Sequence, residues 1–462
     1  MTESYRCSPK QVEDWNNHFN RTQSDVPNLI ILQFSGSKLN FEALELAYAK
    51  LICKHSALRT TFCMVNGTLY QTVHPYSKER FKIEYRSLVI TEKINSINKV
   101  TNEIQRKLKS LNAGPLIQAV VVLPQDVPIV TFILFFHHII VDHWSINLIK
   151  EDVNNFYKCY SKNVEPVDDT WYCPQLCEYT ERQNIELEKV KNIEKHWGIL
   201  LRKGNWKMNY SKLYANFAHY PEVLKKLDGE INRFRYKEIS LIRNPRGKAI
   251  TLLCDSVLYA TILELRNSRR LSISSIVLAG LILLHFSLTG QVDCIIRSLF
   301  SNRQSPKNRR LVGNLIGTLY LLTSINPSWK FEELLPYIYS IFLNSTKKVV
   351  FNCDSLNKTD VVIKSFLFFN FINSQMSSKS IETSNLNKFS RVRVDCPLVF
   401  NIEELQDSML FTWSFHCDFY NESMVLRLVN QFSSLLTIAL NDPRIRISQI
   451  CEIHDLAINS FS

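Results

Sequence analysis

Glycine is scarce in this chain of 462 residues, which contains only 11 of them. The sequence has neither the glycine-rich loop that cradles nucleotide phosphates nor the glycine fingerprint of dinucleotide-binding proteins. A nucleotide-driven reaction is therefore disfavoured, and any activated substrate must arrive already activated. The G-x-S-x-G pattern is also absent, which disfavours serine-hydrolase chemistry.

Signals for export, membrane insertion and nucleic-acid binding are lacking as well. The first ten residues, MTESYRCSPK, do not form a secretory signal, and the longest apolar runs fall short of the roughly 18 residues that span a bilayer. The 12 cysteines are irregularly spaced, without a zinc-type double pair, and we expect them to be reduced. We expect a soluble, cytoplasmic protein that binds no membrane.

The chain is basic, with a formal net charge of +12. Lys and Arg are spread along the sequence, however, and no basic block or aromatic-interleaved run of the kind found in nucleic-acid binders is present. The charge therefore favours acidic partners in general. We expect no binding of nucleic acid.

One stretch combines a buried strand pattern with polar groups at its end. Ile129–Phe136 is uncharged and typical of a buried strand, and His137, His138 and Asp142 follow directly. Apolar residues spaced along one helical face after Ser145 predict a helix to about residue 160, with Ser145 as its N-cap. Because adjacent histidines point to different sides of the chain, we expect one to face a cavity and the other to pack.

The residues alone leave three interpretations of this loop open. Histidine is the usual general base near neutral pH, and Asp142 could orient a ring or pair with a distant arginine. His137, His138, Asp142 and His143 could instead bind zinc, although no matching cluster occurs elsewhere in the chain. An ordinary strand end without a function is the third interpretation.

Both halves of the chain mix predicted strands and helices. Ser8-Pro9 and Asn40 predict helix starts, and Asn66-Gly67 predicts a hairpin. Residues 161–173 are polar and contain proline, as linkers do, and the basic residues 301–310 predict an exposed loop. We expect a mixed α/β fold with an N-terminal lobe of residues 1–165, a linker at 166–180 and a C-terminal lobe of 181–462. The elements expected in the second half are strands at 234–241, 293–300, 365–373, 392–401 and 410–419 and helices at 253–270, 274–287, 331–347 and 422–440.

The loop HHIIVDHWS resembles the HHxxxDG motif of the condensation domains of nonribosomal peptide synthetases, within the chloramphenicol-acetyltransferase-like acyltransferase superfamily. KHSALRTTF is similar to the family's H-x-x-L-R-T-x-F segment. CPQLCEYTERQ with HWGILLRKG, and DCIIRSLFSNR with LVGNLIGTLYLLTSI, resemble later family segments. The resemblance covers nearly the whole chain.

This resemblance implies two chloramphenicol-acetyltransferase-like lobes in a V, with the active site in a tunnel between them. Carrier proteins would present donor and acceptor on 4'-phosphopantetheine arms, and the chain itself would bind no cofactor and no metal. An acceptor amine or hydroxyl would attack the donor thioester and form an amide or ester. The expected residues are His138 as general base or orienting group, His137 in support, and Asp142 paired with Arg303 or Arg59.

The chain also departs from the family pattern. His143 stands in place of the motif glycine, which reduces backbone freedom and could bring a side chain near the donor carbonyl. Gly317 and Thr323 replace the Asn and Arg of the later motif, and VVFNCDSL lacks the proline of the H-Q-D-x-P-F segment.

Three functional hypotheses follow. The first is a freestanding condensation enzyme, because no adenylation or carrier-protein motif is visible in the sequence. As a monomer it would receive carrier proteins or synthetase modules in trans, and its basic charge would suit acidic carriers. The second is a coenzyme-A-dependent acyltransferase of the same superfamily. The third is a catalytically degenerate domain that binds carriers or recruits other enzymes.

Overall fold

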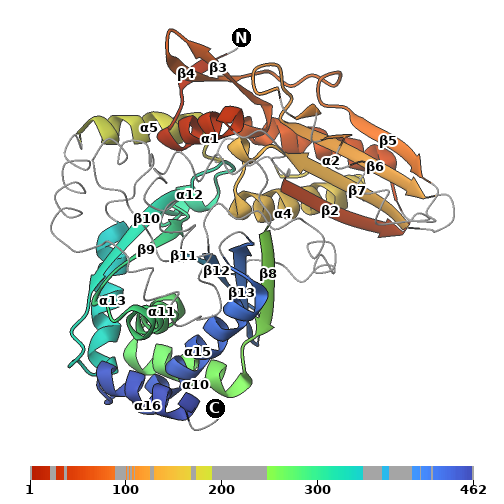
Figure 1. Ribbon diagram of the computed structural model, residues 1–462. Coiled ribbons are helices and arrows are strands. Elements are labelled where there is room, and N and C mark those ends of the chain that lie inside the picture. Colours follow the sequence, from red (N-terminus) through yellow and green to blue (C-terminus); the bar gives the residue numbers. More distant parts are fainter. Residues whose placement is uncertain are drawn as a thin grey trace. The chain divides into compact units, whose positions relative to one another are not determined.

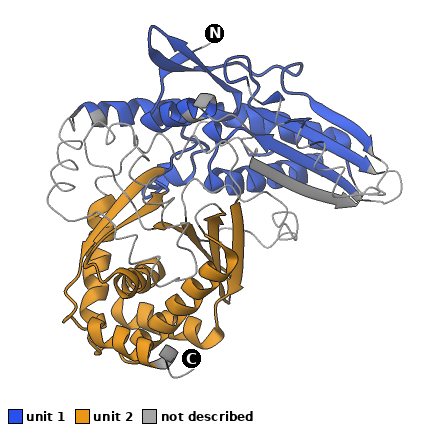
Figure 2. Ribbon diagram, viewed as in Figure 1, with its two compact units in different colours: residues 1–191, 301–316, 377–388 blue, residues 192–300, 317–376, 389–462 orange. Residues whose placement is uncertain are grey.

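The computed structural model forms two compact units (Figures 1 and 2). Unit 1 comprises residues 1–191, 301–316 and 377–388, and unit 2 comprises 192–300, 317–376 and 389–462. The residues described are 3–20, 28–35, 39–88, 100, 103–104, 107–108, 110–124, 129–167, 173–189, 247–346, 367–373, 398–405, 407–417 and 420–459. The mixed α/β class predicted from the sequence is confirmed.

Unit 1 contains two sheets. The first has four strands in the order β2 (Asn28–Ser35), β7 (Ile129–Phe136), β6 (Ile117–Pro124) and β5 (Ile83–Leu88). Strand β7 runs antiparallel to both of its neighbours, and β5 is parallel to β6. The second sheet has the order β1 (Glu3–Arg6), β4 (Thr68–Val73) and β3 (Thr60–Val65).

Strand β7 is buried on both faces, as its uncharged sequence predicts. Phe132, Leu134 and Phe136 pack into the main core of unit 1, which also holds residues of helices α2 (Phe41–Lys54) and α4 (His143–Tyr160). Ile133 and Phe135 point to the opposite face and pack with Val100, Ile104 and Leu108. Because β7 is packed on both faces, it gives the loop that follows it a fixed starting point.

The predicted starts of the first helices and hairpin are confirmed. Helix α1 (Pro9–Asn20) begins with a reciprocal pair, in which the Gln11 N–H donates to Ser8 Oγ and the Ser8 N–H donates to Gln11 Oε1. Asn40 caps α2 by accepting from the Ala43 N–H at 3.0 Å. Asn66 and Gly67, at φ 49° and 76°, form the turn between β3 and β4.

Unit 2 is built on a six-stranded mixed sheet. Its order is β10 (Gly317–Ser324), β9 (Asp293–Phe300), β11 (Leu367–Asn373), β12 (Leu398–Glu404), β13 (Met409–His416) and β8 (Gly247–Leu253). Strand β11 is parallel to β9 and β12, and the other pairs are antiparallel. The associated helices are α10 (Ser256–Arg269), α11 (Ile273–Thr289), α13 (Phe331–Thr346), α15 (Glu422–Asn441) and α16 (Ile447–Asn459).

The core of unit 2 explains its apolar helices. Almost every residue of α11 is buried, and Phe400 packs against Trp413 and Phe432 between the sheet and α15. By length and composition alone, α15 could cross a membrane, as could the bent pair α10 and α11 taken together. Half of the apolar window of α15 is buried in the protein, which accounts for its composition without a membrane.

Some predicted boundaries were wrong. Residues 176–180, expected in a linker, begin helix α5 (Leu176–Lys189), which is held to unit 1 by a hydrogen bond from Gln71 Nε2 to Thr180 Oγ1. Residues 301–316, expected in the C-terminal lobe, belong to unit 1, because Leu311, Val312 and Leu315 pack into its core. The predicted lobes of 1–165 and 181–462 therefore differ from the compact units.

Residues 301–310 are also not simply an exposed loop, since Arg303 is buried and Pro306–Arg309 forms helix α12. Strand β9 coincides with the strand expected at 293–300. Three more of the five expected strands and all four expected helices are present with shifted ends, whereas β8, β10 and α16 were not predicted. The strand expected at 234–241 and the segments HWGILLRKG and VVFNCDSL lie outside the described residues.

Candidate active site

The two histidines after β7 occupy different environments. The His137 side chain is only 6% exposed, and its Nδ1 accepts the Ile139 N–H at 3.1 Å. Its Nε2 lies 3.2 Å from Nδ1 of His18 on α1. His138 begins a single 3₁₀ turn, His138–Ile140, and its side chain is exposed. His137 is thus the histidine that packs inside the protein, and His138 is the one exposed to solvent. Their adjacent positions in the sequence could not show which is which.

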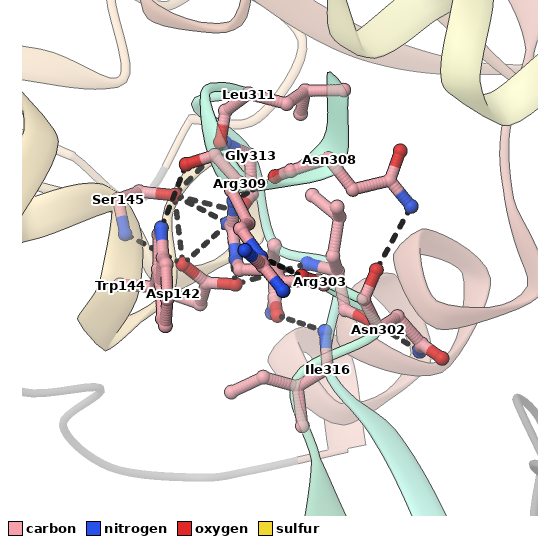
Figure 3. Close-up of polar contacts among 12 residues, drawn as sticks. Asp142, Trp144, Ser145, Asn302, Arg303, Asn308, Arg309, Leu311, Gly313 and Ile316 are labelled. Atoms are coloured by element: carbon pink, nitrogen blue, oxygen red, sulfur yellow. Dashed lines mark hydrogen bonds and ion pairs between the residues drawn. The ribbon is translucent and has the colours of Figure 1, made fainter. Parts of the chain in front are cut away.

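Asp142 forms a buried ion pair with Arg303, one of the two partners predicted for it (Figure 3). Arg303 Nη2 lies 2.9 Å from Asp142 Oδ1 and 2.8 Å from Oδ2. Asp142 is 1% exposed and Arg303 is 3% exposed. Removing one partner of such a pair leaves an uncompensated buried charge, so the pair fixes the loop after β7 to residues 301–316.

Asp142 is also the N-cap of α4, in place of the predicted Ser145. Its Oδ1 accepts the Ser145 N–H at 2.8 Å and the Ser145 hydroxyl at 2.7 Å. Its Oδ2 accepts the Leu315 N–H at 3.3 Å. Both carboxylate oxygens therefore accept hydrogen bonds within this network, which ties the loop after β7 to the start of α4 and to Leu315.

Arg303 is held by backbone carbonyls as well as by Asp142. Its Nη1 donates to the carbonyls of Asn308 and Leu311 at 2.7 and 2.6 Å. The preceding residue, Asn302, adopts φ 54° and donates from Nδ2 to the Leu315 carbonyl at 2.7 Å. Residues 302–315 therefore fold around the guanidinium group of Arg303 (Figure 3).

The other predicted arginine, Arg59, has a different role. Its Nη1 donates to the His74 carbonyl at 2.8 Å, and the His74 N–H donates to the Arg59 carbonyl at 2.9 Å. These bonds tie the end of a short 3₁₀ helix, Ser56–Arg59, to the chain just after β4. The alternative pairing of Asp142 with Arg59 is thus wrong.

Asn314 also contacts His138, although no sequence pattern indicated it. Its Nδ2 lies 3.0 Å from Nδ1 of His138 and 2.8 Å from Oδ2 of Asp14 on α1. Asp14 in turn forms an ion pair with Lys10, whose Nζ lies 2.9 Å from Oδ1 of Asp14. Burial by itself would lower the pKa of Lys10, but the neighbouring Asp14 and Glu13 carboxylates raise it above its usual value. Asn314 lies in the segment LVGNLIGTLYLLTSI but at none of the positions compared with the family, so no sequence signal marked it.

His143, which replaces the motif glycine, is the exposed first residue of α4. The positive-φ residues other than glycine in the described part of the chain are Asn66, Asn163, Arg270 and Asn302. The backbone at His143 therefore needs no glycine, and the substitution introduces no strain. The His143 side chain adds bulk beside the loop and takes no part in the Asp142–Arg303 network.

The zinc interpretation finds no support in the arrangement of these side chains. Asp142 is committed to Arg303 and Ser145, and His137 to Ile139 and His18. Among the residues that the structure describes, no group of three or more His, Cys, Asp or Glu side chains could hold a metal ion. The described cysteines are all free of disulfides.

Comparison with known proteins is consistent with this geometry. The family described as condensation domain matches residues 1–456. The chain belongs to the condensation-domain family. This condensation domain is 22% identical over 440 residues to the nonribosomal peptide synthetase TES of Alternaria alternata, an alignment that covers 91% of the chain and 8% of that synthetase. It is 23% identical over 455 residues to the dimodular nonribosomal peptide synthase of Bacillus subtilis, covering 94% of the chain and 18% of that protein. The chain thus spans only a small part of these curated relatives.

Solved structures share the fold at low sequence identity. The condensation domain of the monacolin K polyketide synthase MokA aligns with a TM-score of 0.72 at 16% identity, covering 96% of this chain and 99% of that one. The X-domain from teicoplanin biosynthesis also aligns with a TM-score of 0.72, at 14% identity and 96% coverage of both chains. Domains of different kinds share this fold, so the fold does not decide the reaction.

Two further departures of this condensation domain lie in unit 2. Gly317 is the buried first residue of β10, paired with Phe300 of β9. Thr323, where the family segment has arginine, is fully buried and donates from Oγ1 to the Cys294 carbonyl at 3.2 Å. Thr323 therefore stabilises the sheet in this chain and presents no charge.

Proposed function

We propose that this condensation domain joins a thioester-bound acyl or aminoacyl group to an amine or hydroxyl acceptor, forming an amide or ester in natural-product biosynthesis. The observation that carries the proposal is the exposed His138, presented beside the buried His137 at the end of β7. The Asp142–Arg303 pair supports the same loop. A rigidly held imidazole is suited to hydrogen bonding with a reacting group.

The proposed reaction needs no cofactor bound by the chain. The acceptor nitrogen bonds to the thioester carbon, and the carbonyl electron pair moves to oxygen. Collapse of this tetrahedral intermediate breaks the carbon–sulfur bond. The amine proton passes to the leaving thiolate, so that the products are an amide and a thiol. His138 hydrogen-bonds to the reacting atoms during these steps.

We propose that the thioesters are presented on the 4'-phosphopantetheine arms of carrier proteins that dock in trans on a monomeric, cytoplasmic enzyme. The net charge of +12 supports this choice of partner, because a basic surface attracts acidic proteins and raises their association rate. Synthetase modules could supply the same carriers.

The test is a turnover assay with a carrier protein loaded with an acyl group, followed by intact-protein mass measurement. His138→Ala should lower turnover by about 100- to 10,000-fold, the range expected for a lost acid–base or orienting group. Because the side chain is exposed, the variant should melt at the same temperature as the wild type. Unchanged turnover would refute the role of His138.

The same assay separates the competing hypotheses when acyl-coenzyme A is offered beside the acyl carrier. Turnover with acyl-coenzyme A alone would favour the coenzyme-A-dependent acyltransferase. The third hypothesis, a domain that binds partners without catalysis, is favoured by the similarity to the X-domain, since that X-domain has been solved in complex with OxyB. Carrier binding without turnover of any donor would support that candidate.

A further inference from the structure

The orientation of the Asn314 side-chain amide is set by partners other than His138. Its Oδ1 accepts the Ile316 N–H at 3.3 Å, and its Nδ2 donates to the Asp14 carboxylate at 2.8 Å. A carboxylate and a backbone N–H have opposite requirements, so together they determine which end of the amide carries the hydrogens. The nitrogen end is therefore the one that lies 3.0 Å from Nδ1 of His138.

This orientation determines where His138 carries its proton. The Asn314 nitrogen has two hydrogens. One points to Asp14, and the other points to His138, where Nδ1 at 3.0 Å and the His138 backbone carbonyl at 3.3 Å share it. Nδ1 must then accept, and a neutral imidazole that accepts at Nδ1 carries its hydrogen at Nε2. A proton on Nδ1 would instead bring two N–H donors face to face.

Burial and an ion pair hold Asn314 and its partner Asp14 in place. Asn314 is 2% exposed, which shields its hydrogen bonds from competition with water. Asp14 lies on α1 with a side chain only 12% exposed, and Lys10, four residues earlier, holds its Oδ1 at 2.9 Å. With Oδ1 engaged by Lys10, Oδ2 is directed at the amide of Asn314.

We infer that Asn314 and Asp14 are positioning residues that hold His138 in the tautomer with hydrogen on Nε2, so that His138 donates a hydrogen bond to the reacting oxygen and does not remove a proton from the acceptor. The role of His138 in the reaction rests on the proposed function, whereas its tautomer does not. The inference decides between the two roles, general base and orienting group, that the resemblance to condensation domains left open.

In this role the His138 Nε2–H donates to the carbonyl oxygen of the donor thioester as that oxygen gains negative charge. A fixed donor at the oxyanion stabilises the tetrahedral intermediate. The acceptor must then be a free amine with its own lone pair, because Nε2 offers no lone pair to deprotonate an ammonium group. An amine is accordingly a better acceptor than a hydroxyl for this site.

The inference is tested by a double variant that reverses the hydrogen bond at Nδ1. In D14N/N314D the amide and the carboxylate exchange places, so shape and total charge are kept, but the new carboxylate beside His138 accepts where the amide donated. The protonated nitrogen is read by ¹⁵N NMR of protein labelled on its 11 histidines, with His138→Gln identifying the His138 signal. We expect hydrogen on Nε2 in the wild type and on Nδ1 in the double variant.

N314L and N401L complete the NMR series. Asn314→Leu removes the donor and should leave His138 as a mixture of tautomers. Asn401→Leu, a matched change in β12 of unit 2, should leave the His138 signal as it is in the wild type. A wild-type spectrum with hydrogen on Nδ1 would overturn the inference whether or not the protein has any activity.

Turnover gives the second readout. If His138 donates, D14N/N314D should lower kcat by about 100- to 1,000-fold, the loss typical of a missing oxyanion donor. If His138 is a general base, the same variant frees the Nε2 lone pair, and kcat should be kept or rise. Absence of wild-type turnover on all donors would refute the proposed function, while the NMR result would still decide the tautomer.

Discussion

Arg303 Nη2 contacts both carboxylate oxygens of Asp142, at 2.9 and 2.8 Å, across 161 residues of sequence. The pair joins the loop after β7 to the segment that leaves β9. Both side chains are almost fully buried, and they also hydrogen-bond to other residues of the two segments that they connect. The position of His138 at the end of β7 therefore depends on a residue encoded far away.

Breaking this pair should destabilise the fold strongly. Arg303→Met leaves the Asp142 carboxylate buried without its cation, at an expected cost of about 3–5 kcal/mol in the free energy of unfolding. Urea denaturation followed by circular dichroism measures the loss. The matched control is Arg6→Met, which breaks the exposed Arg6–Glu188 pair and should cost less than about 1 kcal/mol. Equal losses in the two variants would contradict the structural role of Arg303.

Gly313 should tolerate no side chain in the present packing. A Cβ atom there would lie 2.5 Å from Cδ1 of Leu176 and 3.1 Å from Cδ2 of Leu311. Gly313→Ala should therefore lower the free energy of unfolding by about 1–3 kcal/mol, measured by thermal or urea denaturation. In the background of Leu176→Ala, which removes the nearest atom, the same substitution should cost clearly less. An equal cost in both backgrounds would show that the strain arises elsewhere.

Restoring the motif glycine at position 143 should change little. His143 is exposed at the first position of α4, and its backbone needs no glycine. We expect His143→Gly to lower the free energy of unfolding by no more than about 1 kcal/mol, from helix propensity. Turnover should change by less than about threefold, as surface substitutions normally do. A large gain in turnover would show that the imidazole obstructs the donor.

His285 should make the stability of unit 2 depend on pH. It lies in α11 with 3% exposure, and burial lowers its pKa from 6.5 to about 4. Between these values the unfolded chain binds more protons than the folded one, so the stability contributed by neutral His285 is present above pH 6.5 and is lost as the pH falls toward 4.

The variant His285→Leu removes this titration. On moving from pH 7 to pH 5, the wild type should lose about 2 kcal/mol more in the free energy of unfolding than the variant, because each pKa unit corresponds to about 1.4 kcal/mol. Denaturation curves of both proteins at the two pH values give the difference. Identical losses would show that His285 becomes protonated in the folded protein at its ordinary pKa.

Local sequence alone determined the elements around the site. The uncharged run Ile129–Phe136 is typical of a buried strand. The cap residues Ser8 and Asn40 begin helices because their side chains satisfy free N–H groups within three residues. The Asn66-Gly67 turn forms because these residues accept positive φ. Such features depend on neighbours in sequence, so they were readable without a structure.

The roles of the site residues were decided by contacts between distant segments. Neighbouring histidines alternate sides by strand geometry, but only His18 and the Ile139 N–H determine that His137 is the buried one. Both Arg59 and Arg303 had the charge to pair with Asp142, and only the core packing of residues 301–316 brings Arg303 there. Asn314 carried no sequence signal, because its amide nitrogen is directed by Asp14, which lies 300 residues away in the sequence and meets it only in the folded protein.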